Sequence, residues 1–523
     1  MFLQDINRIY ETIYPPSFQP RYASWWIAQE NIDYAGDTIQ DEYIDFRLLV
    51  LRVCLLSIQS LSHAKLPTTG ILSRPEAMEQ LYSSLADKLE KFRSPEKMPS
   101  IETVQHKILH VGYLKNYGKI RESWSVLNTA VKDAHEMGLY LKDPGIPISE
   151  LDMELRRRTF WNLYVWDRFM CTFFGYWPLI PEGYFDIEPP YDNLQALTTS
   201  PYVLTPFTDR VFHIKLARYL TAFMSPPSWK RDQQDPAVVS IFAQCFHQVI
   251  VDQLPPPFSL ESPDNSWDAV ESALILKREI LSLFIYTTRA SLYRSFMDPC
   301  KTLHRVQGVR SKHGPDLLAL SHRRALMDTT CKMLSCITRL YAFTGSEGLS
   351  AERLLLLPIC LVDTLASLVV CLLSIQADER RLSMEGIQTI TDSDLQRSYQ
   401  AFFDGFGLLY RQAPHYSFAK RGVSVLEGLH GILRGGLNGT DLFEDSLTGT
   451  AMTGSFSSGQ THPTGYFQLE QALMSLHANG GGSGGEIQGC TSLALPEWLP
   501  SFLESPTRSW LFYGQAILGG VLA

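Results

Sequence analysis

The sequence lacks the residue patterns by which most catalytic and metal sites are recognised. It has no phosphate-binding loop, no HExxH pair, no nucleophile elbow and no dinucleotide fingerprint. Its nine cysteines are scattered, no two are spaced as C-x2-C, and the 13 histidines do not cluster at ligand spacing. We therefore expect that the chain is not an enzyme and has no catalytic residue, no cofactor-binding residue and no metal ligand. Dispersed cysteines of this kind are typical of reduced, buried thiols.

A secretory signal and a membrane span are also missing. Polar residues occupy the first positions, where a signal peptide would be apolar. One apolar stretch, 354–375, contains Asp363, and an acid near the centre of a bilayer is costly, so we expect a buried helix and no membrane contact. The net charge of −9 repels phosphate, so tight binding to nucleic acid would need a locally basic surface.

Patterns typical of strands are few, and apolar residues recur at helical spacing over most of the chain. Residues 101–117 and 121–137 are two amphipathic stretches separated by Gly118, which predicts an antiparallel helix pair. Their apolar stripes are Val104, Ile108, Val111 and Leu114, and Trp124, Leu127, Val131 and Ala134. Residues 150–174 are apolar on all sides in their middle, which indicates a helix buried on all sides. We predict an all-α fold, with one large irregular helical domain over residues 1–435.

The last part of the chain, residues 436–523, differs in composition. It holds 15 of the 34 glycines and carries seven acids and one base. This composition predicts a mostly disordered, acidic, glycine-rich tail. Within it, the segment 495–504 mixes acids with Trp498 and Phe502. Two alternatives stay open for this segment: an activation region that binds a coactivator, or an element that docks on the helical body.

A series of short motifs follows the Gly118 turn in a fixed order. In sequence order they are Arg121-x-x-Trp124, Ala134-x-x-x-Gly138-Leu139, Glu154, the triplet Arg156, Arg157 and Arg158, Phe160-Trp161, Tyr164, Asp167-Arg168, Gly175 to Pro178, and Asp186 to Pro190. In this order they resemble the middle homology region, or fungal specific transcription factor domain, of the fungal zinc-cluster transcription factors. The best-matching core is 101–195. The family's Gly-x-Pro has one extra residue here, since Gly175 and Pro178 are separated by two residues.

The resemblance implies a transcription regulator of the nucleus that controls a metabolic or secondary-metabolite gene cluster. The partners it implies are a related transcription factor in a homo- or heterodimer, a coactivator bound through the tail, and a small-molecule effector. Members of the family hold two zinc ions in an N-terminal six-cysteine cluster that binds DNA, and this sequence contains no such cluster. We therefore expect no zinc in this chain, and DNA contact only through a partner or through a missing N-terminus. Two explanations stay open for the absence of the zinc cluster: the gene has lost the DNA-binding module, or its start has been mispredicted.

The charged motifs permit a second interpretation. Arg156, Arg157 and Arg158 could form a basic patch for DNA, but on a helix Arg157 can reach Glu154 and cover the ring of Trp161. We therefore expect ion-pair and packing roles for the triplet. By the same reasoning Asp167 and Arg168 form a buried polar network. The stretch 301–324 has six Lys or Arg and three His, and it is predicted to be a solvated loop.

Two other functions compete with transcription: an all-α enzyme of the terpene-synthase type and a helical protein-interaction scaffold. Asp41, Glu42 and Asp45 have the spacing with which terpene synthases hold magnesium. The second motif of those enzymes, an Asn followed by Ser or Thr and then Glu, is missing. We expect these acids to mark the start of a helix, where the dipole favours negative charge.

Overall fold

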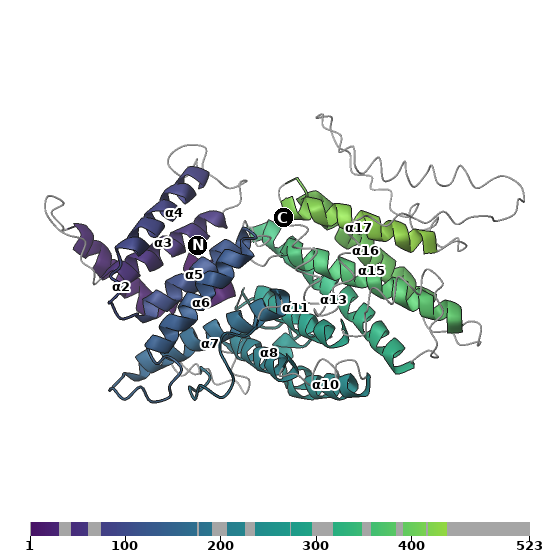
Figure 1. Cartoon of the computed structure of the whole chain (residues 1–523), viewed down its shortest axis with the longest axis horizontal. Coiled ribbons are helices and arrows are strands. Elements are labelled where there is room, and N and C mark those ends of the chain that lie inside the picture. The colour runs from purple at the N-terminus through teal and green to yellow at the C-terminus, as the bar shows by residue number, and fades with distance from the viewer. Residues whose placement is uncertain are drawn as a thin grey trace, which may run out of the picture. The chain divides into compact units, whose positions relative to one another are not determined.

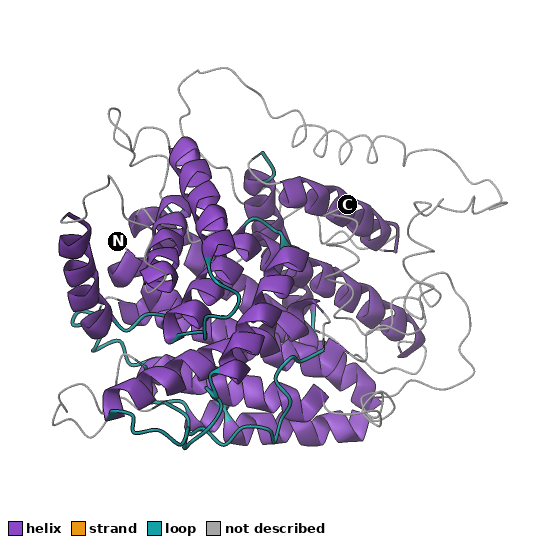
Figure 2. Ribbon diagram, turned by 60° about the vertical axis from the view of Figure 1, so that its left-hand side comes forward, coloured by secondary structure: helices purple, strands orange, loops and turns teal. Residues whose placement is uncertain are grey.

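A computed structural model describes eleven stretches of the chain. They are residues 2–30, 43–60, 75–174, 177–190, 207–224, 236–271, 273–294, 317–347, 357–382, 391–414 and 417–436. Within these stretches all regular structure is helical and no strand occurs, as Figure 2 shows. The prediction of an all-α fold is confirmed. The predicted tail after Gly436 lies outside the described residues, and so do residues 301–316 of the basic stretch 301–324. The prediction of a solvated loop is wrong for the rest of that stretch, since residues 317–324 are helical and His322 and Arg323 are buried.

The described residues of the first half form one π-helical turn and eight α-helices. They are η1 (Phe2–Ile6), α1 (Asn7–Tyr10), α2 (Pro15–Glu30), α3 (Ile44–Gln59), α4 (Pro75–Phe92), α5 (Ile101–Asn116), α6 (Ile120–Glu136), α7 (Glu150–Phe174) and α8 (Thr208–Met224). The second half adds α10 (Pro236–Val249), two 3-10 turns, η5 (Val251–Gln253) and η6 (Pro256–Phe258), and then α11 (Ala273–Tyr293), α13 (Leu317–Glu347), α15 (Leu357–Leu382), α16 (Asp392–Gln412) and α17 (Ser417–Gly436). The described helices as far as Leu433 belong to one compact unit. The division of the chain at residue 435 stays a prediction.

The helix pair α5 and α6 is set by local sequence. Ser100 and Thr103 form a reciprocal cap, with Thr103 N donating to Ser100 Oγ at 3.3 Å and Ser100 N donating to Thr103 Oγ1 at 2.8 Å. Gly118, with φ 71°, allows the sharp turn into α6, and Gly138, with φ 59°, ends α6. The α5 stripe is buried as predicted; in the α6 stripe Trp124 is only partly buried, while its three other members are in the core.

Helices of the first half pack around α5. Helix α3 contacts both α4 and α5, and α5 contacts α6 and α7 (Figure 1). Helix α8 then joins this group to the second half, because it contacts α7 on one side and α11 on the other.

Helices of the second half pack around α13, which contacts α11, α15 and α16 (Figure 1). Helix α16 comes close to its neighbours at Gly405, where a Cβ atom would lie 3.0 Å from side-chain atoms of Leu334 and Leu365. A side chain at this position would therefore push α16 away from α13 and α15.

The apolar stretch tested for a membrane span is the buried helix α15. Its Asp363 forms an ion pair with Arg294, the residue that follows α11. None of the described helices is long and apolar enough to cross a bilayer. Five cysteines are buried side chains as expected, namely Cys171, Cys331, Cys336, Cys360 and Cys371, whereas Cys54 is half-buried and Cys245 is exposed.

Candidate functional site: the polar network of α7

Helix α7 carries most of the family-like motifs, and its first turn is capped by Ser149. The Ser149 hydroxyl accepts a hydrogen bond from Asp152 N at 3.0 Å and donates one to Asp152 Oδ2 at 2.6 Å. The helix then becomes apolar on every side, and Phe160, Trp161, Leu163 and Tyr164 are all at most 2% exposed. The prediction of a helix buried on all sides is thus confirmed for the middle of α7.

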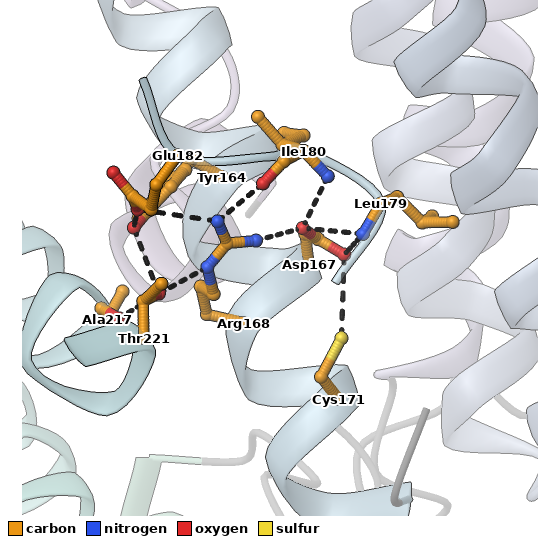
Figure 3. A network of polar contacts seen from close by, with 9 residues as sticks. All are labelled: Tyr164, Asp167, Arg168, Cys171, Leu179, Ile180, Glu182, Ala217 and Thr221. Carbon is orange, nitrogen blue, oxygen red and sulfur yellow. Dashed lines mark hydrogen bonds and ion pairs between the residues drawn. The ribbon is translucent and has the colours of Figure 1, made fainter. Parts of the chain in front are cut away.

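Asp167 and Arg168 form the centre of the network drawn in Figure 3. The Asp167 carboxylate accepts from the backbone amides of Leu179 and Ile180, at 2.9 Å and 3.0 Å. It also pairs with the Arg168 guanidinium. Burial raises the pKa of the Asp167 carboxyl, while Arg168 and the two amides act in the opposite direction. The predicted buried polar network is confirmed.

Arg168 connects three segments of the chain. Its guanidinium donates to the carbonyl of Ile180 and to the hydroxyl of Thr221 on α8, and it lies over the ring of Tyr164, 4.3 Å from the centroid (Figure 3). Glu182 accepts from Arg168 Nη2 at 3.4 Å and from the Tyr164 hydroxyl. Because these donors and acceptors face one another, the network holds α7, α8 and the segment 177–190 together.

The arginine triplet faces the protein and not the solvent. Arg156 donates to the carbonyls of Met137 and Gly138 at 3.0 Å and 2.7 Å, so it caps the end of α6. Glu154, only 1% exposed, pairs with Arg158 Nε at 3.0 Å and with Arg157 Nη1 at 3.6 Å. The expected Glu154–Arg157 pair is therefore present.

Two aromatic contacts of this region differ from the expected one. The cation over the Trp161 ring is Arg218 of α8, with its guanidinium carbon 6.0 Å from the ring centroid. Within the triplet it is Arg158 that lies over aromatic rings, those of Tyr14 and Phe207, at 4.9 Å and 4.4 Å. Sequence spacing pointed to a contact within α7, whereas α8 and the residues just before α2 and α8 supply the partners.

The acidic loop that ends in two prolines, residues 186–190, packs against α7. Trp161 Nε1 donates to the carbonyl of Glu188 at 2.8 Å, and Arg157 Nη2 lies 3.9 Å from a Glu188 carboxylate oxygen. Asp186 accepts from the backbone amide of Lys142 at 2.8 Å. Gly175 and Tyr176 of the Gly-to-Pro motif lie outside the described residues. The other motifs from residues 134–190 contact one another, through a helix cap, ion pairs, ring contacts and the closing loop, so their role is structural.

The acids considered for magnesium have a different role where the structure describes them. Asp45 lies at the start of α3 and is bound by Arg93 Nε at 2.8 Å and Lys97 Nζ at 3.4 Å. Asp41 and Glu42 lie outside the described residues. No group of three or more His, Cys, Asp or Glu side chains suited to a metal occurs in the described stretches.

Sequence reasoning missed a second buried charge cluster. Lys277 of α11 pairs with Glu11 Oε1 at 2.6 Å and with Asp209 Oδ1 of α8 at 3.2 Å. Glu11 has φ 47°, a left-handed conformation that costs a non-glycine residue free energy. A lysine inside the apolar run of α11 was the only available signal, and it gave no indication of partners 68 and 266 residues away.

A second lysine, Lys115 of α5, is buried beside aromatic rings. Its ammonium lies 5.6 Å from the ring centroid of Tyr10 and 5.4 Å from that of Trp166. Burial lowers the pKa of Lys115 to about 7. Helical periodicity could not identify it, because long side chains also cover apolar surface from exposed positions.

An apolar pocket of about 570 Å³, open to solvent, lies between η1, α2 and α3. Its lining contains no charged side chain, and the residues are Phe2, Leu3, Phe18, Gln19, Tyr22, Val50, Val53 and Cys54. The sequence gave no sign of it, because its walls come from three separate helices.

Comparison with known proteins identifies the part of the chain that carries these motifs. Residues 1–253 match the model of the fungal specific transcription factor domain. Over this stretch, just under half of the chain, the sequence is similar to that domain. The matched stretch includes α7, its network and the apolar pocket, and it extends beyond the 101–195 core predicted from the motifs.

Two curated fungal relatives share the similarity. A protein named probable transcription factor sol4, from Alternaria solani, is 26% identical over 352 residues, which cover 65% of this chain and 59% of that protein. A protein named transcription factor xilB, from Penicillium rubens, is 21% identical over 364 residues, covering 66% of this chain and 52% of that protein. The chain therefore spans little more than half the length of these relatives. No solved structure matches the chain.

These matches agree with the prediction of a transcription regulator and do not favour the enzyme or the scaffold. The family and both relatives are transcription factors, a class that is generally not enzymatic and acts in the nucleus. The resemblance noted in the sequence is confirmed.

Proposed function

We propose that this chain is the regulatory body of a fungal transcription factor that acts in the nucleus on a metabolic or secondary-metabolite gene cluster. The observation that carries the proposal is the fungal specific transcription factor domain over residues 1–253, together with relatives named as transcription factors. The mutual contacts of the α7 motifs support it, because a sealed, structural network fits a regulatory body better than a catalytic centre.

In this proposal the helical body restrains an activating tail. Support comes from the composition of residues 436–523, where acids surround Trp498 and Phe502 in a glycine-rich sequence. The test tethers two proteins to a reporter promoter through an unrelated DNA-binding domain: the full chain, and residues 436–523 alone. We expect the tail fusion to activate more strongly than the full-chain fusion, and Trp498→Ala with Phe502→Ala to abolish the activity.

Silent fusions, with the protein expressed and present in the nucleus, would contradict the proposal and favour a scaffold. Exclusion of the tagged full chain from the nucleus would contradict it as well. The double substitution Ser457→Ala with Ser458→Ala in the same tail is the matched control and is expected to leave activation unchanged.

DNA contact is proposed to come from a partner, a homo- or heterodimer with a related transcription factor, or from a zinc cluster outside this sequence. The chain offers no cysteine pair for such a cluster, and its arginine triplet bonds to groups inside the protein. The purified chain is expected to contain no stoichiometric zinc and to leave promoter fragments unshifted at near-physiological salt. Tight, sequence-dependent binding by the chain alone would overturn this part.

A small-molecule effector is the last element of the proposal, and the apolar pocket between η1, α2 and α3 supports it. A lining free of charge suits an uncharged, apolar molecule. The uncharged dye N-phenyl-1-naphthylamine is expected to fluoresce on binding, and Val53→Trp, which fills the pocket, is expected to reduce that signal. An equal dye signal in the folded Val53→Trp variant would show that the dye binds elsewhere and would remove the support.

A further inference from the structure

Two histidines of α5 lie one helical turn apart, close to Arg52 of α3. His106 is 1% exposed, and neither nitrogen of its ring has a hydrogen-bond partner among the described residues. His110 is partly buried, and its ring lies 6.3 Å from that of Tyr113. Side chains four residues apart lie on the same face of a helix. Since the charge of Arg52 acts on the pKa of both rings, this face is the one toward α3.

Arg52 is fixed to α4 by two carboxylates. Its side chain is 0% exposed, and its Nη2 lies 3.3 Å from Glu90 Oε2 and 3.7 Å from Asp87 Oδ1. Its Nε and Nη1 have no hydrogen-bond partner in the part of the chain that the structure describes. A buried guanidinium in this condition is sensitive to any further charge placed beside it. Arg52 is therefore the group against which a charge on α5 would act.

The surroundings favour the neutral form of both rings. Burial lowers the pKa of His106 well below its usual range, and the positive charge of Arg52 acts in the same direction. The same two causes lower the pKa of His110 to about 3. The other charges that lower these two pKa values belong to Arg93, Lys107, Lys119 and, for His106, His110 itself. A proton on either ring would therefore lie among positive charges.

The carboxylates of this region already bind other cations. The ion pairs are those of Asp45 with Arg93, Asp133 with Lys107, and Asp87 and Glu90 with Arg52. Tyr113 of α5 and Glu79 of α4 are the other titratable side chains that act on this cluster. A protonated histidine would have to share a carboxylate with a cation that is already bound, which gives it little stabilisation.

Helices α3 and α4 form a small unit beside α5. Helix α4 contacts α3, and α3 in turn contacts α5 (Figure 1). The apolar core that α3 and α4 share consists of Ile44, Leu48 and Ala86, with Leu51 and Leu89 packed against it. Ala86 is the one residue of α4 that is fully buried. A unit with so few buried side chains opens at a lower free energy than the whole protein.

We propose that the α3–α5 contact is an acid-sensitive switch, at which protonation of His106 and His110 beside Arg52 releases α3, together with α4, from α5. Helix α4 stays with α3 because its carboxylates, which bind Arg52, remain ionised well below the pH at which histidine titrates. Helix α3 also supplies one wall of the apolar pocket, so its release opens that pocket. This switch goes beyond the proposed function and does not depend on its transcriptional part.

Acid favours the released form because the two rings titrate normally only there. An exposed histidine has a pKa of about 6.5, whereas both pKa values are lower while α3 is in place. Above about pH 7.5 both rings are neutral in either form, and the contact has its full stability. Between about pH 7.5 and pH 5.5 the released form binds protons that the closed form does not bind. Each histidine then shifts the equilibrium toward release by about tenfold, and the two together by about a hundredfold.

Amide hydrogen exchange of the full chain, measured by mass spectrometry at about pH 7.5 and pH 5.5, tests the switch. After correction for the intrinsic exchange rate, the protection of α3 and α4 is expected to be about a hundredfold lower at the acid pH. The internal reference is α15, which contains no histidine and is expected to keep its protection.

Substitutions of the two histidines test which groups are responsible. His106→Leu with His110→Gln removes both titrating rings, so α3 and α4 are expected to be equally protected at the two pH values. His110→Gln alone removes one ring and is expected to leave a loss of about tenfold. The matched control is His247→Gln on α10, a histidine whose side chain is 57% exposed, which is expected to keep the full loss of the unsubstituted protein.

Three results would overturn the proposal. Equal protection of α3 and α4 at both pH values in the unsubstituted protein would show that acid does not release them. A loss of the same size in α15 would show that the whole protein opens, not this contact. A hundredfold loss that persists in His110→Gln would exclude that histidine, and this variant decides the matter if the double variant does not fold. None of these measurements uses a promoter or a ligand, so a failure here is distinguishable from a failure of the proposed function.

Discussion

Trp161 is the side chain whose removal tests the α7 core most directly. It is 2% exposed, and its ring lies 5.2 Å to 5.6 Å from those of Phe160, Tyr164 and Phe185. It also donates from Nε1 to the carbonyl of Glu188 at 2.8 Å. Trp161→Ala removes the ring contacts and leaves a cavity. These two effects together are expected to lower the free energy of unfolding by about 3–5 kcal/mol. The lost hydrogen bond adds about 1 kcal/mol.

The assay is urea denaturation of the full chain, followed by helical circular dichroism and supported by thermal unfolding. For a unit of this size the unfolding entropy is on the order of 1 kcal/mol/K, so the melting temperature falls by about 4 °C. Trp177→Ala is the matched control, since that tryptophan is 76% exposed and its loss changes stability by less than about 0.5 kcal/mol. Equal stabilities of the Trp161→Ala and Trp177→Ala variants would refute the buried position of Trp161.

Three further predictions concern charged side chains. Lys277→Met leaves the carboxylates of Glu11 and Asp209 buried without the Lys277 ammonium and is expected to cost about 3–5 kcal/mol of stability in urea denaturation. Adding Glu11→Gln and Asp209→Asn is expected to recover much of the lost stability, and no recovery would contradict the pairing. Lys115 has a folded-state pKa of about 7, below its unfolded value, so the unfolded chain binds more protons between pH 7 and about pH 10 and stability rises across that interval. Lys115→Met is therefore expected to be more stable than wild type below pH 7, with the difference shrinking toward pH 10, and a difference independent of pH would show that Lys115 is solvated. Arg156→Ala removes the cap on the Met137 and Gly138 carbonyls and is expected to lower the melting temperature by about 2 °C, whereas exposed Arg121→Ala on α6 should not.

Local patterns in the sequence were sufficient for the helices but not for their partners. Gly118 and Gly138 mark the ends of α5 and α6 because their left-handed conformations are a local requirement. The extent of α7, Glu150–Phe174, also follows from its own apolar residues. Periodicity predicts which face of a helix is buried, since that face must meet apolar surface of some kind.

The identity of a polar partner depends instead on how helices pack. Asp45 could be read as a metal ligand because Arg93 and Lys97, which bind it, lie beyond another whole helix in the sequence. Arg218 lies over Trp161 although a residue of α7 was expected there. The apolar pocket likewise became recognisable only once the positions of η1, α2 and α3 relative to one another were known.

The ion pairs of Lys277 have a consequence for how the chain is made. Glu11 leaves the ribosome long before α11 does, and the family match ends at residue 253, short of Lys277. Until α11 has been made, Glu11 and Asp209 therefore lack the ammonium group of Lys277, with which both are paired in the folded protein. A fragment that ends at residue 253 leaves both carboxylates without that partner, so its contacts around Glu11 are expected to be less stable than those of the full chain.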